Sequence, residues 1–254
     1  VNSLYLHPNV APFLSRQLIQ RLTTSNPSRG YIDRVAATFE DDGQGVRGNL
    51  GAVVKSILLD PEARAAIPAT QFGKLREPIL RLTAVLRAFG VQNGNTGTNG
   101  LTATERTLFQ APLRAASVFN FYGPDYQQPG EIADAGLYSP EFQIMNESTF
   151  ITTSDEFWRR IFSGYNTNSA TATSFTVPNT TAYLPSAMID AIPTEHAALV
   201  EALNQKLLYG TMSETMRGKL VALLNGGMAS ADHRRKVLSL IHLIAISAEF
   251  SVQQ

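Results

Sequence analysis

The residues most able to carry acid–base chemistry are one histidine and two carboxylates that lie far apart in the chain: His7, Glu141 and Asp155. A hydrolase that acts on a polymer needs such groups, because one side chain gives a proton while another takes one. The sequence does not show whether these side chains meet. His7 stands before Pro8, just ahead of an expected helix, where an ordinary hydrogen-bonded histidine is the simpler interpretation. The three residues are therefore candidates for a catalytic role, with Glu147 and Glu156 as further carboxylates nearby in sequence.

Two other patterns suggest cofactor or metal sites, and both lack the context they need. Gly43–Gly48 matches G-x-G-x-x-G, but a dinucleotide site needs a strand before that motif, and residues 31–40 have helical periodicity. A calcium loop that starts at Asp41 would need Glu at its twelfth position, which is Ala52. The four histidines have no zinc-type spacing, and the chain has no cysteine. We predict no cofactor and no bound metal.

Composition narrows the classes of partner. The 254 residues carry 21 Lys and Arg against 21 Asp and Glu, so the net charge is zero. This balance removes the electrostatic basis for binding nucleic acid. The longest strongly apolar run, Val237 to Ile246, spans about ten residues, whereas a membrane-spanning helix needs about 20. We expect no membrane span in this part of the protein.

Helical periodicity and helix-start residues recur along the chain, which predicts an all-α, irregular multi-helix fold with long ordered loops. Start signals stand at Asn9, Ser28, Asn49, Glu77-Pro78, Ser139-Pro140-Glu141, Thr194-Glu195, Ser213 and Ser230-Ala231-Asp232. The Ser139 signal predicts a helix that runs towards Asn146, and residues 149–162 continue helical. Residues 163–181 form an uncharged polar segment that is read as a loop or one short β-hairpin.

This pattern suggests three parts. Residues 1–164 form a helical domain with an aromatic and proline-rich strap, 165–192 a Ser/Thr/Asn-rich loop or linker, and 193–254 helices that pack on the same core.

The last predicted helix, from about Asp232 to Ala248, is apolar on nearly every face and should be surrounded, either by other parts of this chain or by a neighbouring subunit. His242 within it is expected to be a core histidine hydrogen-bonded to a neighbour. Leu243→Ala should cost about 2–5 kcal/mol of folding free energy. The end of this helix, residues 243–249, faintly echoes residues 56–62, an echo too short to establish a duplication.

Short motifs occur in a distinctive order: His7-Pro8, Tyr31-Ile32-Asp33-Arg34-Val35-Ala36, Gly45-Val46-Arg47-Gly48-Asn49-Leu50, Ile57-Leu58-Leu59-Asp60-Pro61-Glu62, Ser117-Val118-Phe119-Asn120-Phe121-Tyr122 and Ser139-Pro140-Glu141-Phe142. In this order they resemble the C-terminal half of the bacterial exported family called domain of unknown function 1800. The resemblance covers residues 1 to about 162 and about 240 to 254. It implies a periplasmic or extracellular protein with a further helical half upstream, which fits a sequence that starts at Val1 as part of a longer precursor. It implies no activity and no catalytic residues.

Two functions follow as expectations. The first is a structural or interaction protein that assembles with itself, with its own upstream half or with a co-exported protein of the family called domain of unknown function 1501. Its basis is the uncharged polar composition, the aromatic strap and the absence of a coherent catalytic pattern. The alternative is an extracytoplasmic enzyme, such as a hydrolase acting on a polymer, with His7, Glu141 and Asp155 as its groups.

Overall fold

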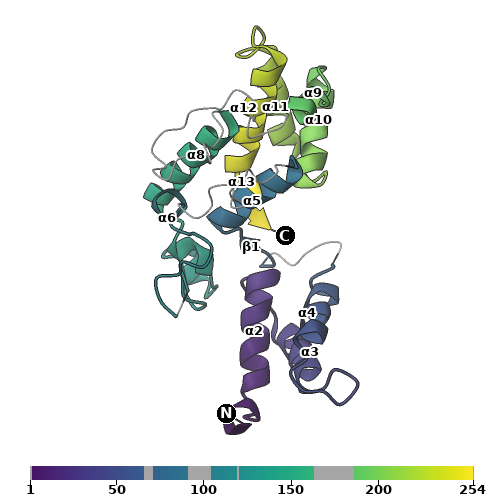
Figure 1. Cartoon of the computed structure of the whole chain (residues 1–254), viewed down its shortest axis with the longest axis vertical. Coiled ribbons are helices and arrows are strands. Elements are labelled where there is room, and N and C mark those ends of the chain that lie inside the picture. Colours follow the sequence, from purple (N-terminus) through teal and green to yellow (C-terminus); the bar gives the residue numbers. More distant parts are fainter. Residues whose placement is uncertain (1, 66–70, 91–103, 119, 163–185, 254) are drawn as a thin grey trace. The chain divides into compact units, whose positions relative to one another are not determined.

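The computed structural model describes residues 2–65, 71–90, 104–118, 120–162 and 186–253. In these ranges the chain is mostly helical with long loops, as the sequence predicts (Figure 1). The chain divides into two compact units. Unit 1 comprises Val1–Leu75, Tyr122–Gln143 and Val252–Gln254, and unit 2 comprises Arg76–Phe121 and Ile144–Ser251. These boundaries differ from the expected ones at residues 164 and 192, and the suggested hairpin at 163–181 lies outside the described residues.

Unit 1 is built on three helices, α2 (Val10–Leu22), α3 (Arg29–Glu40) and α4 (Leu50–Leu59), preceded by the single turn α1 (Asn2–Tyr5). Two expected helix starts are confirmed, because the side chain of Ser28 accepts from the N–H of Tyr31 and that of Asn49 accepts from the N–H of Ala52. The apolar sides of the three helices form one buried cluster: Ala11, Ile19, Tyr31, Val35, Ala36, Phe39, Val53 and Ile57.

The rest of unit 1 consists of short elements. Strands β1 (Lys74–Leu75) and β2 (Val252–Gln253) pair antiparallel, with Lys74 opposite Gln253 and Leu75 opposite Val252. Helix α7 (Glu131–Asp134) and the 3₁₀ turn η2 (Pro140–Gln143) complete the unit. This strand pair joins segments far apart in the chain, and no local pattern of residues predicts it.

The prediction of a helix from Ser139 towards Asn146 is wrong, because only the turn η2 forms there. The hydroxyl of Ser139 accepts from the N–H of Gln128 at 2.8 Å and so does not cap a following helix. A separate helix, α8 (Glu147–Phe162), begins after Asn146, whose side-chain oxygen accepts from the N–H of Thr149 at 3.0 Å.

Unit 2 packs its other helices around a central one, α12 (His233–Ile246). These are α5 (Pro78–Ala88), α6 (Glu105–Leu108), α8, α9 (Ser186–Asp190), α10 (His196–Leu203) with the π-helical turn η3 (Asn204–Leu208), α11 (Glu214–Asn225) and α13 (Ala248–Ser251) (Figure 1). Ser213 and Asp232 cap α11 and α12 as expected. Val237, Leu240, Ile241, Ile244 and Ala245 are all 0% exposed. The expectation of a central, surrounded last helix therefore holds for most of its length. Among the described residues, no helix is both long and apolar enough to cross a membrane.

Candidate functional site

The three candidate catalytic residues lie in different surroundings. His7 is exposed, and its Nδ1 accepts from the N–H of Asn9 at 3.1 Å, close to the start of α2. Glu141 is 1% exposed and lies beside the last turn of the same helix. Because α2 has 13 residues, about 20 Å separates its two ends, so His7 and Glu141 do not meet. Asp155 lies on the exposed side of α8 in unit 2.

Glu141 forms a buried ion pair with Lys74, a residue that the sequence did not single out. The Nζ of Lys74 lies 2.9 Å from Glu141 Oε1, and both side chains are 1% exposed. The same Nζ donates to the carbonyl oxygens of Gln20 at 3.0 Å and Arg21 at 2.9 Å. All three ammonium hydrogens thus have acceptors. Two of those acceptors belong to the last turn of α2, where helix carbonyls lack partners within the helix.

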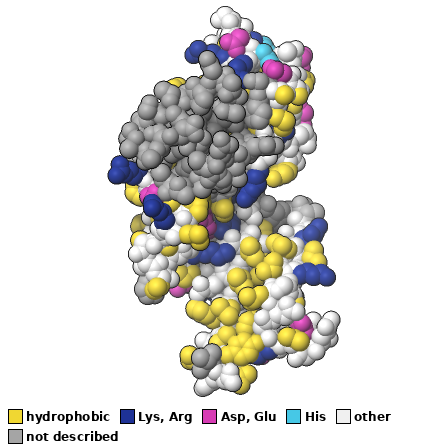
Figure 2. Space-filling model, viewed as in Figure 1, with side chains coloured by type: hydrophobic (Ala, Val, Ile, Leu, Met, Phe, Trp, Pro, Cys, Tyr) yellow, Lys and Arg dark blue, Asp and Glu magenta, His cyan; other side chains and the backbone are white. Residues whose placement is uncertain are grey.

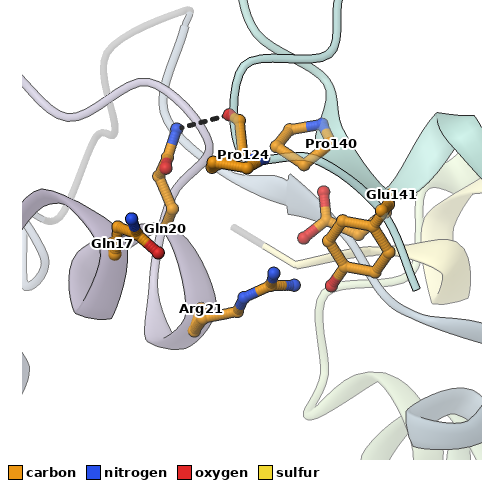
Figure 3. A pocket seen from close by; sticks show the side chains of 7 residues that line it. Gln17, Gln20, Arg21, Pro124, Pro140 and Glu141 are labelled. Atoms are coloured by element: carbon orange, nitrogen blue, oxygen red, sulfur yellow. Dashed lines mark hydrogen bonds between the residues drawn. The ribbon is translucent and has the colours of Figure 1, made fainter. Parts of the chain in front are cut away.

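A small cavity adjoins this pair inside unit 1 (Figure 3). It is lined by Gln17, Gln20, Arg21, Tyr122, Pro124, Pro140 and Glu141. Gln20 Nε2 donates across it to the carbonyl of Pro124 at 3.3 Å, and the guanidinium of Arg21 lies 4.3 Å from the centre of the Tyr122 ring. Among the described residues, no group donates to Glu141 Oε2 or Gln20 Oε1, which are both buried.

The cavity has a volume of about 10 Å³, which is room for one water molecule and not for a substrate. Glu141, Lys74 and Gln20 therefore form an internal polar centre that ties α2, β1 and η2 together. Within the described part of the chain, no group of three or more His, Asp or Glu is placed to hold a metal ion.

His242 in unit 2 behaves as the expected core histidine. Its Nε2 donates to the carbonyl oxygen of Ser154 in α8 at 3.2 Å, and its ring meets that of Phe162 edge-on at 6.4 Å. Burial lowers the pKa of His242, while the hydrogen bond to Ser154 and the charge of Asp155 act in the opposite direction. The hydrogen bond of His242 to Ser154 links α12 to α8, and the candidate Asp155 acts on His242 only through its charge.

The largest departure from the sequence interpretation is on α4. The helix that starts after Asn49 carries the apolar residues Leu50, Val53, Val54, Ile57 and Leu58, of which only Val53 and Ile57 are buried. Leu50 is 56% exposed, Leu58 48% and Leu59 53%. One signal was available in the sequence, because this ten-residue helix has a single charged residue, Lys55, and is apolar on more than one side.

Leu50, Val54 and Leu58 follow one another at intervals of four residues and so lie along one side of α4. We call these residues, with Gly51 and Lys55, the α4 face. Unit 1 exposes other apolar residues, Leu4, Leu6 and Val46, and the hydroxyl of Tyr5 donates to the carbonyl of Arg47 before the start of α4. Figure 2 shows hydrophobic side chains gathered on the visible surface of unit 1.

Comparison with known proteins places the chain in a family but not with a relative of known role. No curated protein and no solved structure matches it. The family model described as "Protein of unknown function (DUF1800)" matches residues 1–252, nearly the whole chain. The chain therefore belongs to the DUF1800 family, as the order of its motifs indicates.

Proposed function

We propose that this protein is an exported interaction protein that assembles through the apolar surface of unit 1. The observation that supports it is the α4 face with its exposed leucines. Single exposed apolar residues are common on proteins, but a contiguous apolar patch is typical of a surface that contacts another protein.

The charges near the α4 face agree with this proposal. Lys55 is the one charged residue of α4. The adjoining Arg47 pairs with Glu40 and also donates to the carbonyl of Tyr5 at 3.1 Å. A largely uncharged apolar surface loses little on desolvation, so burying it against a partner is favourable.

The alternative, a hydrolase, gains no comparable support. Glu141 faces a cavity that holds one water at most, and His7 lies at the other end of α2. Export and a co-exported partner of the domain of unknown function 1501 family, both implied by the family resemblance, form part of the proposal.

The test compares the assembly of the wild-type chain with that of Leu50→Glu/Leu58→Glu. Sedimentation of the chain alone and in a mixture with the co-exported protein should show a complex that the double variant does not form. Leu113→Glu, which changes a fully exposed leucine in unit 2, is the matched control and should assemble normally. Circular dichroism would check that each variant is folded. A wild-type chain that stays monomeric and binds no co-exported protein would contradict the proposal.

A further inference from the structure

Units 1 and 2 contain the same arrangement of a capped helix and a returning glutamate. In unit 1, Ser28 caps α3, and Glu62, which follows α4, accepts from both the N–H of Ser28, at 3.0 Å, and its hydroxyl. In unit 2, Ser213 caps α11, and Glu249, which follows α12, accepts from the N–H of Ser213, at 2.9 Å, and its hydroxyl. The faint echo of residues 56–62 in 243–249 is thus matched by identical contacts.

Placing the two Ser–Glu pairs in register also aligns the core positions of the helices. Between α3 and α11, buried Val35 and Phe39 correspond to buried Leu220 and Leu224. Between α4 and α12, Val53 and Ile57 correspond to Leu240 and Ile244, all 0% exposed. The number of residues between the serine and the glutamate differs by two between the units, and the whole difference lies in the loop between the two helices. The two helical pairs therefore share the spacing of their caps and core positions, although α3 packs closely against α4 whereas α11 and α12 do not pack closely against each other.

The two helical pairs differ in what covers their second helix, which is α4 in unit 1 and α12 in unit 2. Leu50 and Leu58 are 56% and 48% exposed, whereas their counterparts, Val237 and Ala245, are 0% exposed. In unit 2 the helices α8, α10, α5 and α9 pack against α12 and share its core cluster. Among the described residues, unit 1 has no element in the place that α8 takes in unit 2.

The counterpart of Lys55 identifies the charge that a covering helix should carry. Lys55 aligns with His242, which donates to the Ser154 carbonyl of α8 and is acted on by Asp155 of that helix. Lys55, a cation at the edge of the α4 face, thus corresponds to a position that contacts the covering helix α8 in unit 2. An apolar face bordered by one lysine suits an amphipathic helix with an acidic residue at that height.

We propose that the α4 face binds an amphipathic helix of a partner protein, laid on α4 as α8 lies on α12, with a carboxylate beside Lys55. This rests on the proposed interaction function and adds the form and the charge of what is bound. Gly51, where α12 has Leu238, leaves room for such a helix to approach α4 closely, because nothing but the side chain of Asn49 lies within 4 Å of the place of a Cβ there.

The test uses the full chain and a blocked, fluorescently labelled peptide with the α8 sequence, Glu147–Phe162, as the partner helix. Fluorescence anisotropy should show binding that Leu58→Glu abolishes and Leu113→Glu leaves unchanged. Lys55→Glu should weaken binding about fivefold, the scale of one partly exposed ion pair. A peptide with Asp155→Lys should bind the Lys55→Glu chain with the affinity restored, and it should bind the wild-type chain less tightly.

The outcomes separate this inference from the proposed function. The helix-binding model would be overturned if the peptide did not bind, or if Leu58→Glu left binding intact. It would also be overturned if the charge exchange between Lys55 and Asp155 left the affinities unchanged. Assembly that still depends on Leu50 and Leu58 would then leave the interaction function standing with another kind of partner. A dimer of the chain itself, lost in Leu58→Glu, would identify a second copy as the occupant and would also overturn the inference.

Discussion

The carboxylate of Glu62 accepts hydrogen bonds from both the backbone N–H and the hydroxyl of Ser28, and thereby joins the end of α4 to the start of α3. The hydroxyl of Ser28 at the same time accepts from the N–H of Tyr31. One serine therefore satisfies an otherwise unpaired helix N–H and receives a carboxylate near the positive end of the α3 dipole. Glu249 and Ser213 repeat this arrangement in unit 2.

Removing either serine should destabilise its own unit by a similar amount. Ser28→Ala and Ser213→Ala should each cost about 1 kcal/mol, because each removes a helix N-cap. Amide hydrogen exchange should rise in α3 for the first variant and in α11 for the second. Ser230→Ala, at an exposed serine, is the control and should change neither. A large effect in one unit and none in the other would contradict the equivalence of the two serine–glutamate caps.

The buried pair of Lys74 and Glu141 makes a second prediction. Lys74→Met should lower the free energy of unfolding by about 3–5 kcal/mol, because it leaves a buried carboxylate without a cation and two α2 carbonyls without a donor. The double variant Lys74→Met/Glu141→Leu should recover most of that loss. Urea denaturation measures both. Arg29→Ala, which removes the exposed pair of Arg29 with Asp33, is the control and should cost under about 1 kcal/mol. A single variant as stable as the wild type would disprove a structural role for the pair.

How far the sequence predicts the structure depends on the range of each interaction. The caps at Ser28, Asn49, Ser213 and Asp232 were predictable because each side chain meets an N–H three residues further on. Ser139 has the same local signal, yet its hydroxyl accepts from Gln128, eleven residues away, and the expected helix shrinks to one turn. A local signal therefore fails where a more distant group competes for the same side chain.

The candidate sites show the same limit. Glu141 was identified from its residue type, but its partner Lys74 lies far away in sequence, and no local pattern joins the two. The apolar residues of α4 are evident in the sequence, but their exposure at Leu50 and Leu58 is not. Periodicity shows which side of a helix is apolar, whereas burial depends on which helices are present to cover it.

The lowered pKa of His242 predicts a loss of stability in acid. Burial disfavours the charged imidazolium in the folded chain, so the unfolded chain takes up a proton near its ordinary pKa of 6.5 that the folded chain does not. The free energy of unfolding should therefore be unaffected by this group above that pH and should fall as the pH drops below it. His242→Gln should reduce the slope of the free energy of unfolding against pH, and His7→Gln, at an exposed histidine, should not. Urea midpoints measured across this range would test it, and an equal slope in wild type and His242→Gln would contradict it.

Two neighbouring residues of α12 separate a core position from its edge. The cost expected for Leu243→Ala from the sequence assumed full burial, but Leu243 is only partly buried, whereas Ile244 is 0% exposed. Ile244→Ala removes buried methyl and methylene groups and leaves a cavity among α12 and its neighbours, so it should cost about 2–5 kcal/mol. Leu243→Ala should cost less, because surrounding side chains and water can reach the space it leaves. Both variants keep the helix former alanine, so the difference reports packing alone. In thermal denaturation, the melting temperature of Ile244→Ala should lie well below that of Leu243→Ala. The reverse order would show that α12 is turned differently in the core of unit 2.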